Sequence, residues 1–293
     1  MRGDWGQMTE ITHRTLSAGA IDLHIAEAGP LQGPLVILLH GFPEFWFEWR
    51  DLLGPLAEAG FRVAAPDQRG YNLSAKPKGV DAYRLDRLAD DIFAMADALG
   101  RERFQVVGHD WGASVAWWMA GRGPERLERL AILNAPHPAL WKRAMTEDPE
   151  QRKKSRYVQL LRTPWLPELL VRAGGYSGLA DAFRTATRPE AFGPDAMARY
   201  REAWRRPGAL TGGLNWYRAL FRQDLPVPAP GSLKPPTLVL WGDRDIFAEA
   251  KLAEESAALC AEARVVHFPD AGHWLPHDEP EPVARELLAF LKR

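Results

Sequence analysis

Apolar and polar positions alternate along the chain in two distinct ways. Residues 34–39, PLVILL, form an unbroken apolar run, which is typical of a strand buried on both faces of a mostly parallel sheet. Residues 85–99 instead place apolar side chains three and four positions apart, which predicts a helix with one buried face. By such patterns strands are expected at 11–16, 21–26, 34–39, 62–66, 104–107, 127–134, 236–241 and 264–268, and helices at 45–59, 85–99, 112–121, 247–259 and 281–291. Strands that alternate with helices at short spacing predict an α/β fold with a largely parallel, eight-stranded sheet and flanking helices.

This alternation stops after Pro136 and resumes after residue 225. The intervening segment is rich in arginine, tryptophan and proline, and its pattern indicates short helices joined by loops. A proline-rich stretch at 226–230 marks the return to strand and helix alternation. We therefore predict one core, made of residues 1–136 and 226–293, and an inserted helical cap at 137–225.

Composition excludes several classes of function. Hydrophobic residues make up 46% of the 293 residues and charged residues 26%, which is ordinary for a globular protein. The net charge of −1 gives no electrostatic reason to expect a nucleic acid or an anionic membrane as partner. Cys260 is the only cysteine, which excludes an intrachain disulfide and a cysteine metal site. We expect no cofactor and no metal, and a monomer or a homodimer.

The N-terminus and the longest apolar run indicate where in the cell the protein is expected. The run at residues 34–39 is far below the roughly 20 apolar residues that span a bilayer. The N-terminus lacks the apolar segment of a secretory signal, so a cytoplasmic location is expected. Met1 and Met8 are both candidate starts, because the residues between them carry no structural pattern.

The segment Gly108-His109-Asp110-Trp111-Gly112 lies between a predicted strand and a predicted helix. This is the context of a nucleophile elbow, in which small residues two positions before and after the nucleophile permit a tight turn. Asp110 would be the nucleophile. A carboxylate that attacks an sp³ carbon forms an ester that an activated water can cleave, whereas a serine would form a stable ether. Asp110 therefore points to alkyl transfer from epoxides or alkyl halides.

Two further candidates, Asp245 and His273, follow predicted strands, where α/β sheets place their ligand-binding groups. The order Asp110, Asp245, His273 is the nucleophile–acid–histidine order of α/β-hydrolases. It predicts His273 as the base that activates water and Asp245 as the group that orients His273. Asp243 competes with Asp245 for this role, and either aspartate could instead cap the following helix.

A second motif, His40-Gly41-Phe42-Pro43, follows the apolar strand at 34–39. The backbone N–H groups of Phe42 and Trp111 are predicted to form an oxyanion hole. In this chemistry the hole would stabilise the tetrahedral intermediate that forms when water attacks the Asp110 ester.

Several motifs together resemble those of a known family. They are HGFPEFW from His40, PDQRGYNLS from Pro66, GHDWGAS from Gly108, NAPHP from Asn134, LNWYR from Leu214 and AGHW from Ala271. The chain is similar, from about residue 20 onward, to the α/β-hydrolase-fold epoxide hydrolases of the bacterial core-plus-cap type. Asn72 departs from the family pattern, which usually has glycine there, and lies in a loop expected to be structural.

The resemblance implies that two cap tyrosines bind and protonate the epoxide oxygen. The matching positions are Tyr157, in the context Y-x₆-P-x-L-P-E, and Tyr217, in N-W-Y-R. Ring opening develops an alkoxide, and a phenol with a pKa of about 10 can donate a hydrogen bond or a proton to it. Each tyrosine could instead be an ordinary amphipathic side chain whose hydroxyl meets water.

Two other functions are weighed against epoxide hydrolysis. A haloalkane dehalogenase needs N–H donors around the halide, but Phe42 occupies the position that is often polar in those enzymes. Some dehalogenases carry the acid where Asn134 stands. A non-catalytic hydrolase-fold binding protein is disfavoured by the intact set of Asp110, Asp245 and His273.

The substrate pocket is expected to be apolar and aromatic and to suit a small apolar epoxide, such as one with an aryl group. Its candidate residues are Trp165, Trp216, His109 and Pro43. Some cap tryptophans must only pack the cap, and a supporting role is also considered for His109.

Overall fold

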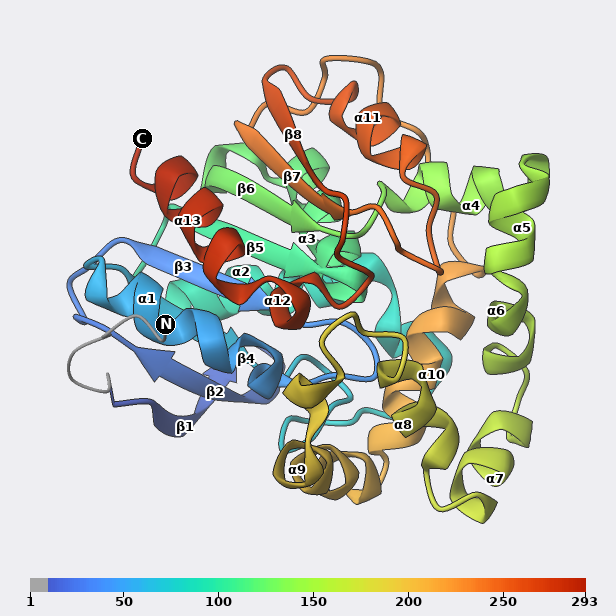
Figure 1. The fold of residues 1–293 in the computed structure, drawn as a ribbon. Coiled ribbons are helices and arrows are strands. Elements are labelled where there is room, and N and C mark those ends of the chain that lie inside the picture. The colour runs from blue at the N-terminus through green and yellow to red at the C-terminus, as the bar shows by residue number, and fades with distance from the viewer. Residues whose placement is uncertain (1–9) are drawn as a thin grey trace.

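The computed structural model describes residues 10–293, and the candidate starts Met1 and Met8 lie outside them. Its strands form one sheet in the order β1-β2-β4-β3-β5-β6-β7-β8 (Figure 1). The strands are β1 (Thr12–Ala18), β2 (Ile21–Ala28), β3 (Leu35–Leu39), β4 (Arg62–Pro66), β5 (Phe104–His109), β6 (Leu127–Leu133), β7 (Thr237–Gly242) and β8 (Ala263–Phe268). β2 pairs antiparallel with β1 and β4, and all other pairs are parallel. The predicted α/β fold with a mostly parallel eight-stranded sheet is confirmed.

Helices cover both faces of this sheet. The core helices and 3-10 turns are η1 (Trp46–Trp49), α1 (Arg50–Glu58), η2 (Val80–Tyr83), α2 (Leu85–Ala98), α3 (Asp110–Arg122), η3 (Pro124–Arg126), α11 (Lys251–Ala257), α12 (Leu275–Asp278) and α13 (Pro280–Leu291). Side chains of β3 alternate between the two faces. Val36 and Leu38 pack with α1 and α13, whereas Ile37 packs on the other side with α2 and α3. Figure 1 shows α1 and α13 in front of the sheet and α2 and α3 behind it.

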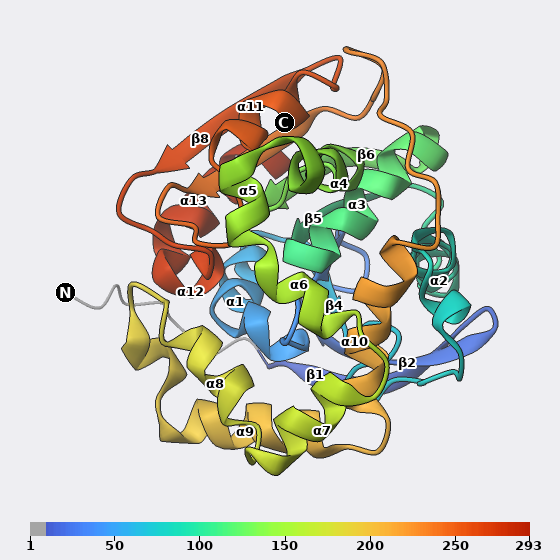
Figure 2. The same cartoon turned by 90° about the vertical axis from the view of Figure 1, so that its right-hand side faces the viewer.

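The chain between β6 and β7 forms helices and no strand. These are α4 (Pro138–Glu147), α5 (Pro149–Lys154), α6 (Arg156–Leu161), α7 (Leu166–Ala173), α8 (Ser177–Phe183), η4 (Pro189–Phe192), α9 (Pro194–Arg205) and α10 (Ala209–Leu220). We call residues 137–225 the cap. Figure 2 turns the cap helices α5, α6, α7 and α10 toward the viewer. No helix within residues 10–293 has the length and apolar character needed to cross a bilayer.

Three core segments differ from the expected elements. The helix expected at 45–59 is divided into η1 and α1. The helix expected at 247–259 begins only at Lys251, because the Asp245 carboxylate holds the preceding residues in a turn. The short helix α12 was not expected from the sequence, since its four residues carry no periodic pattern.

Candidate active site

The nucleophile elbow forms where β5 ends at His109 and α3 begins at Asp110. Asp110 has a φ of 49°, in the left-handed region that is unfavourable for side chains other than glycine. Gly112 permits this turn, because a Cβ there would lie 2.0 Å from the Leu39 carbonyl oxygen. The expected strand–turn–helix geometry is therefore present, and it holds the Asp110 side chain above the sheet edge.

His273 lies between the two carboxylates that the sequence assigned to it. Its Nδ1 is 2.8 Å from Asp245 Oδ2, and its Nε2 is 3.6 Å from Asp110 Oδ2. Asp245 also caps the following turn, since its Oδ1 accepts the backbone N–H groups of Phe247 (2.7 Å) and Ala248 (3.0 Å). Asp245 therefore orients His273 through Oδ2 and holds a turn through Oδ1, whereas α11 begins later, at Lys251, and has no side-chain cap.

The competing aspartate, Asp243, has a different partner. Its carboxylate lies 2.5 Å from His267 at the surface, two residues before the aspartate that contacts His273. Of the two candidates, the structure brings Asp245, and not Asp243, to the histidine.

Asn134 supports the acid, a role that sequence reasoning missed. Its Nδ2 donates to Asp245 Oδ2 (2.8 Å) and to the Gly242 carbonyl (3.2 Å), while its Oδ1 accepts the Gly242 N–H (2.9 Å). Asn134 follows β6, which lies beside β7 in the sheet. Its position at the end of the neighbouring strand was the signal that could have revealed this contact.

Charge interactions keep Asp110 ionised and His273 protonated. Burial would raise the pKa of Asp110, but the positive charge of the neighbouring His273 lowers this pKa below its usual value. Burial would lower the pKa of His273, but the carboxylates of Asp245 and Asp110 raise it to about 10. The resting pair is therefore a carboxylate beside an imidazolium.

The loop after β3 supplies one donor of the expected oxyanion hole. The Phe42 N–H donates to Asp110 Oδ1 over 2.9 Å. Gly41 permits this approach, because a Cβ there would lie 2.6 Å from the Asp110 Cβ. Trp111 lies in the first turn of α3, where backbone N–H groups have no partner within the helix. Oδ1 is thus held by the loop, whereas Oδ2 faces His273.

Tyr157 on α6 and Tyr217 on α10 reach the same cavity from two different cap helices. Their ring centroids lie 6.3 Å apart. Burial raises the pKa of both phenols, and the negative charge of Asp110 raises it further. Both hydroxyls therefore remain protonated and can donate.

The cavity has a volume of about 210 Å³, and Asp110, His273 and both tyrosines line it. The rest of its wall is mostly apolar and includes Phe42, Pro43, Leu161, Leu179, Phe247 and Trp274. Pro43 thus lies where the sequence analysis expected it. Within residues 10–293, no group of three or more His, Cys, Asp or Glu side chains is placed to hold a metal ion.

Three expected pocket residues, Trp165, Trp216 and His109, do not line the cavity, so their placement there is wrong; for His109 the supporting role is the one that the structure shows. Trp165 is 71% exposed at the surface between α6 and α7. Trp216 is buried behind the cavity, where its Nε1 donates to the Arg69 carbonyl over 3.0 Å. His109 is fully buried below the elbow, because β5 residues alternate between the two sheet faces and the next residue carries the nucleophile upward.

His109 forms part of a buried charged pair that sequence reasoning did not find. Its Nε2 donates to the His273 carbonyl (2.8 Å), and its Nδ1 lies 2.6 Å from Glu48 Oε1. Glu48 Oε2 accepts the Gly41 N–H over 2.9 Å. Burial lowers the pKa of His109, but the nearby Glu48 carboxylate raises it above the usual value, which favours the charged form of the ring. The pair joins the oxyanion loop, the elbow and the histidine loop.

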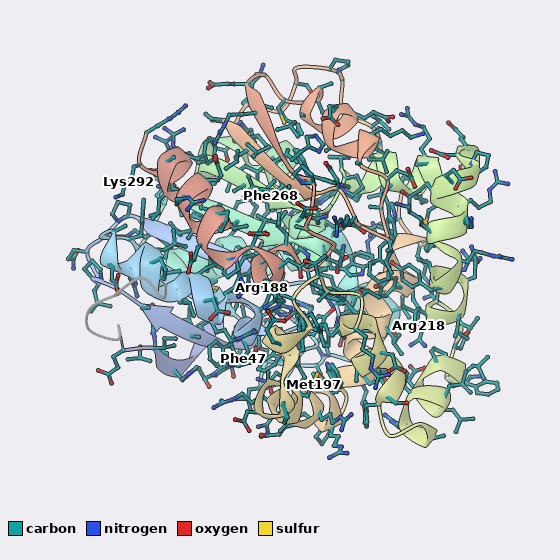
Figure 3. All side chains as sticks on the ribbon, viewed as in Figure 1. Phe47, Arg188, Met197, Arg218, Phe268 and Lys292 are labelled. Atoms are coloured by element: carbon teal, nitrogen blue, oxygen red, sulfur yellow. The ribbon has the colours of Figure 1, made fainter. Side chains whose placement is uncertain are left out.

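The helix α12 joins the histidine loop to the cap. Asp278 accepts the backbone N–H of Arg188, which Figure 3 labels beside α12, over 3.1 Å. His277 Nε2 lies 2.9 Å from Glu44 Oε1, and the Tyr200 hydroxyl of the cap donates to Glu44 Oε2. Buried polar contacts therefore fix the cap relative to the loops that carry the site.

Comparison with known proteins places the chain in a family. The alpha/beta hydrolase fold family matches residues 34–280. The AB hydrolase superfamily protein YfhM of Bacillus subtilis is 43% identical over 94% of this chain and 96% of its own length. Epoxide hydrolase 2 of Caenorhabditis elegans is 34% identical over 95% of this chain and 79% of its own length. A solved structure described among novel epoxide hydrolases in metagenomes from hot environments is 37% identical, with a TM-score of 0.83, and covers 97% of this chain and 99% of that one. The chain therefore belongs to the α/β-hydrolase fold family and, within it, to the epoxide hydrolases.

Proposed function

We propose that this protein converts an epoxide to a vicinal diol through a covalent ester on Asp110. The observation that carries the proposal is the convergence of four groups on one apolar cavity. These are the carboxylate of Asp110, the imidazolium of His273 and the protonated phenols of Tyr157 and Tyr217. The named epoxide hydrolases among the relatives support the same reaction.

In the first step the two phenols bind the epoxide oxygen, and Asp110 Oδ2 attacks one ring carbon. The free oxygen is the better nucleophile because Oδ1 is already engaged by the Phe42 N–H. The carbon–oxygen bond of the ring breaks, and a tyrosine gives its proton to the developing alkoxide. The product of this step is a hydroxyalkyl ester.

Before the second step the imidazolium of His273 gives up its proton, which restores the tyrosine that donated to the alkoxide. Neutral His273 then removes a proton from a water molecule, which attacks Cγ of the Asp110 ester. Ester formation removes the charge of Asp110, one of the two carboxylates that raise the pKa of His273, so this pKa falls and the histidine can act as a base. The N–H groups of Phe42 and Trp111 stabilise the tetrahedral oxyanion. The diol then leaves and Asp110 is regenerated.

We further propose an apolar substrate with an aryl-sized substituent. Most of the wall around the 210 Å³ cavity is apolar, so burial of a ring against it would stabilise the complex. Equal turnover of small polar epoxides and aryl glycidyl ethers would contradict this part of the proposal.

The first experiment is product analysis with styrene oxide and, in parallel, with 1-bromobutane. The proposal expects diol and no bromide. Bromide release without diol would identify a dehalogenase, and tight binding of epoxides without turnover would identify a binding protein. A single turnover in H₂¹⁸O then tests the ester, since the label must enter Asp110 and not the first diol formed.

A further inference from the structure

A second, smaller cavity lies behind the nucleophile. It has a volume of about 30 Å³ and shares four lining residues with the larger cavity. The shared residues are Asp110, Tyr157, Phe247 and His273. Ser114 and Asn134 line the smaller cavity only. We call it the rear cavity.

Aromatic rings form the partition between the two cavities. The Phe247 ring lies 5.4 Å from that of Tyr157 and 4.8 Å from that of His273, measured between centroids. An epoxide in the larger cavity would therefore lie on one side of these rings. The rear cavity reaches the nucleophile and the histidine from the other side.

The rear cavity has the size and the polar groups that a water molecule requires. A water needs at least about 10–15 Å³ of such space and two to four polar partners. Asp110, Ser114 and His273, which carry a carboxylate, a hydroxyl and an imidazole, line the space. Ser114 is buried, and the side-chain hydrogen bonds found within residues 10–293 include none to its hydroxyl. That hydroxyl is thus available to a water in the cavity.

We propose that the rear cavity holds the water that hydrolyses the ester, and that Ser114 orients this water. The inference rests on the proposed function. In the ester, Oδ1 stays with the Phe42 N–H, Oδ2 carries the alkyl group and the substrate body fills the larger cavity. The face of Cγ toward the rear cavity then remains open to attack beside His273.

The step balances within these groups. One water proton passes to His273 Nε2, and the hydroxide oxygen bonds to Cγ. When the bond between Cγ and the alkyl oxygen breaks, the departing alkoxide takes the proton back from the imidazolium. The second water proton, now on the Asp110 carboxyl group, passes to neutral His273, which restores the resting carboxylate and imidazolium. Alkylation and hydrolysis therefore draw their reactants from opposite sides of the Tyr157 and Phe247 rings.

Two substitutions of Ser114 test this assignment. Ser114→Leu fills the rear cavity, and Ser114→Ala removes the hydroxyl with little change of volume. The measurement is rapid acid quenching after mixing with styrene oxide, followed by intact-protein mass spectrometry of the ester. We expect Ser114→Leu to slow ester hydrolysis at least about tenfold and Ser114→Ala about threefold, while ester formation changes less than about twofold.

Ala182→Leu is the matched variant on the other side of the partition. Ala182 lines only the larger cavity, so added bulk there should slow ester formation and leave the hydrolysis rate of the ester within about twofold. Opposite effects of the two leucine substitutions would support separate compartments. Wild-type hydrolysis rates in folded Ser114→Leu and Ser114→Ala would overturn the proposal.

His273→Gln separates failure of this inference from failure of the proposed function. The variant should form the ester and fail to hydrolyse it, so the ester accumulates on the peptide that contains Asp110. If no ester forms in this variant or in the wild type, the proposed function itself is wrong. If the ester is trapped but the Ser114 variants hydrolyse it normally, only the rear-cavity assignment is wrong.

Discussion

In the core, charged groups of the site are held by hydrogen bonds at the ends of parallel strands, whereas the cap contributes two neutral phenols from helices. Asp245 illustrates the first arrangement, because both of its oxygens are engaged by named donors. Tyr157 illustrates the second, since its neighbours in the cavity are the rings of Tyr217 and Phe247. The core and the cap therefore support different kinds of functional group. Ionised groups need a scaffold that compensates their burial, but a phenol tolerates an apolar wall.

The largest effect is expected in the core, for Asp110→Ala. Loss of the nucleophile should abolish diol formation and ester formation, because no other carboxylate of the site contacts the Phe42 N–H. The fold should persist, since the elbow is shaped by glycines and backbone. Turnover of styrene oxide and thermal unfolding measure the two outcomes. Residual ester on another residue would contradict the assignment of Asp110.

The corresponding test of the cap is the double variant Tyr157→Phe with Tyr217→Phe. It removes both proton donors and should lower the rate of ring opening by about 10²–10⁴-fold, the usual contribution of general acid catalysis. Rapid-quench measurement of ester formation detects this loss. Each single variant is expected to be less impaired, because the other phenol lines the same cavity. Unchanged ring opening in the double variant would mean that the cap only encloses the substrate.

These two variants test residues that were predicted from the sequence. Sequence-based predictions succeeded or failed for different physical reasons in the core and in the cap. The role of Asp110 could be predicted from the sequence because its strand, turn and helix occupy consecutive residues, so one short segment contains both the structural pattern and the reactive group. Asp245 was chosen over Asp243 without a local pattern that separates them, because both lie in one loop. The contacts that distinguish Asp245, with His273 and Asn134, come from distant parts of the chain. The prediction that Trp165 lines the pocket was wrong because the orientation of short cap helices depends on tertiary packing, and the periodicity of the sequence carries no information about that packing.

The pair of Glu48 and His109 was equally beyond sequence reasoning, since its members are far apart in the chain. Glu48→Gln should leave the His109 imidazolium buried without its counter-charge. Breaking a buried pair from one side costs about 3–5 kcal/mol, which chemical denaturation can measure. His109→Gln with Glu48→Gln is the control, because removal of both charges should restore part of that loss. Equal destabilisation in single and double variants would argue against a charged pair.

The pH dependence of stability provides a further comparison. The folded-state pKa of His273 is about 10, above its usual 6.5, so its stabilising contribution is complete below about pH 6.5 and is lost as the pH rises toward 10. The pKa values of Asp110 and Asp245 are lowered, so their contributions are present above pH 3.8 and are lost at lower pH. Denaturation at several pH values should therefore show a decline on the alkaline side that His273→Gln flattens. A decline of equal size in that variant would assign it to other groups.

The smallest effect is expected at Trp165, on the outer surface of the cap. Because 71% of this side chain is exposed, Trp165→Ala should change kcat/KM for styrene oxide by less than about twofold and the free energy of unfolding by less than about 0.5 kcal/mol. A large loss of activity would mean that the tryptophan reaches the substrate in solution.

Trp165→Gly sharpens the same comparison. Trp165 has a φ of 53°, a conformation that costs residues other than glycine roughly 1–2 kcal/mol. Glycine relieves this cost but also gains entropy in the unfolded chain, which offsets about 1 kcal/mol of the gain. The glycine variant should consequently be as stable as the alanine variant or slightly more so, whereas the same exchange within a regular cap helix would destabilise. If glycine were clearly the less stable of the two, the left-handed turn would not be retained in solution, and the path of the chain from α6 to α7 would differ.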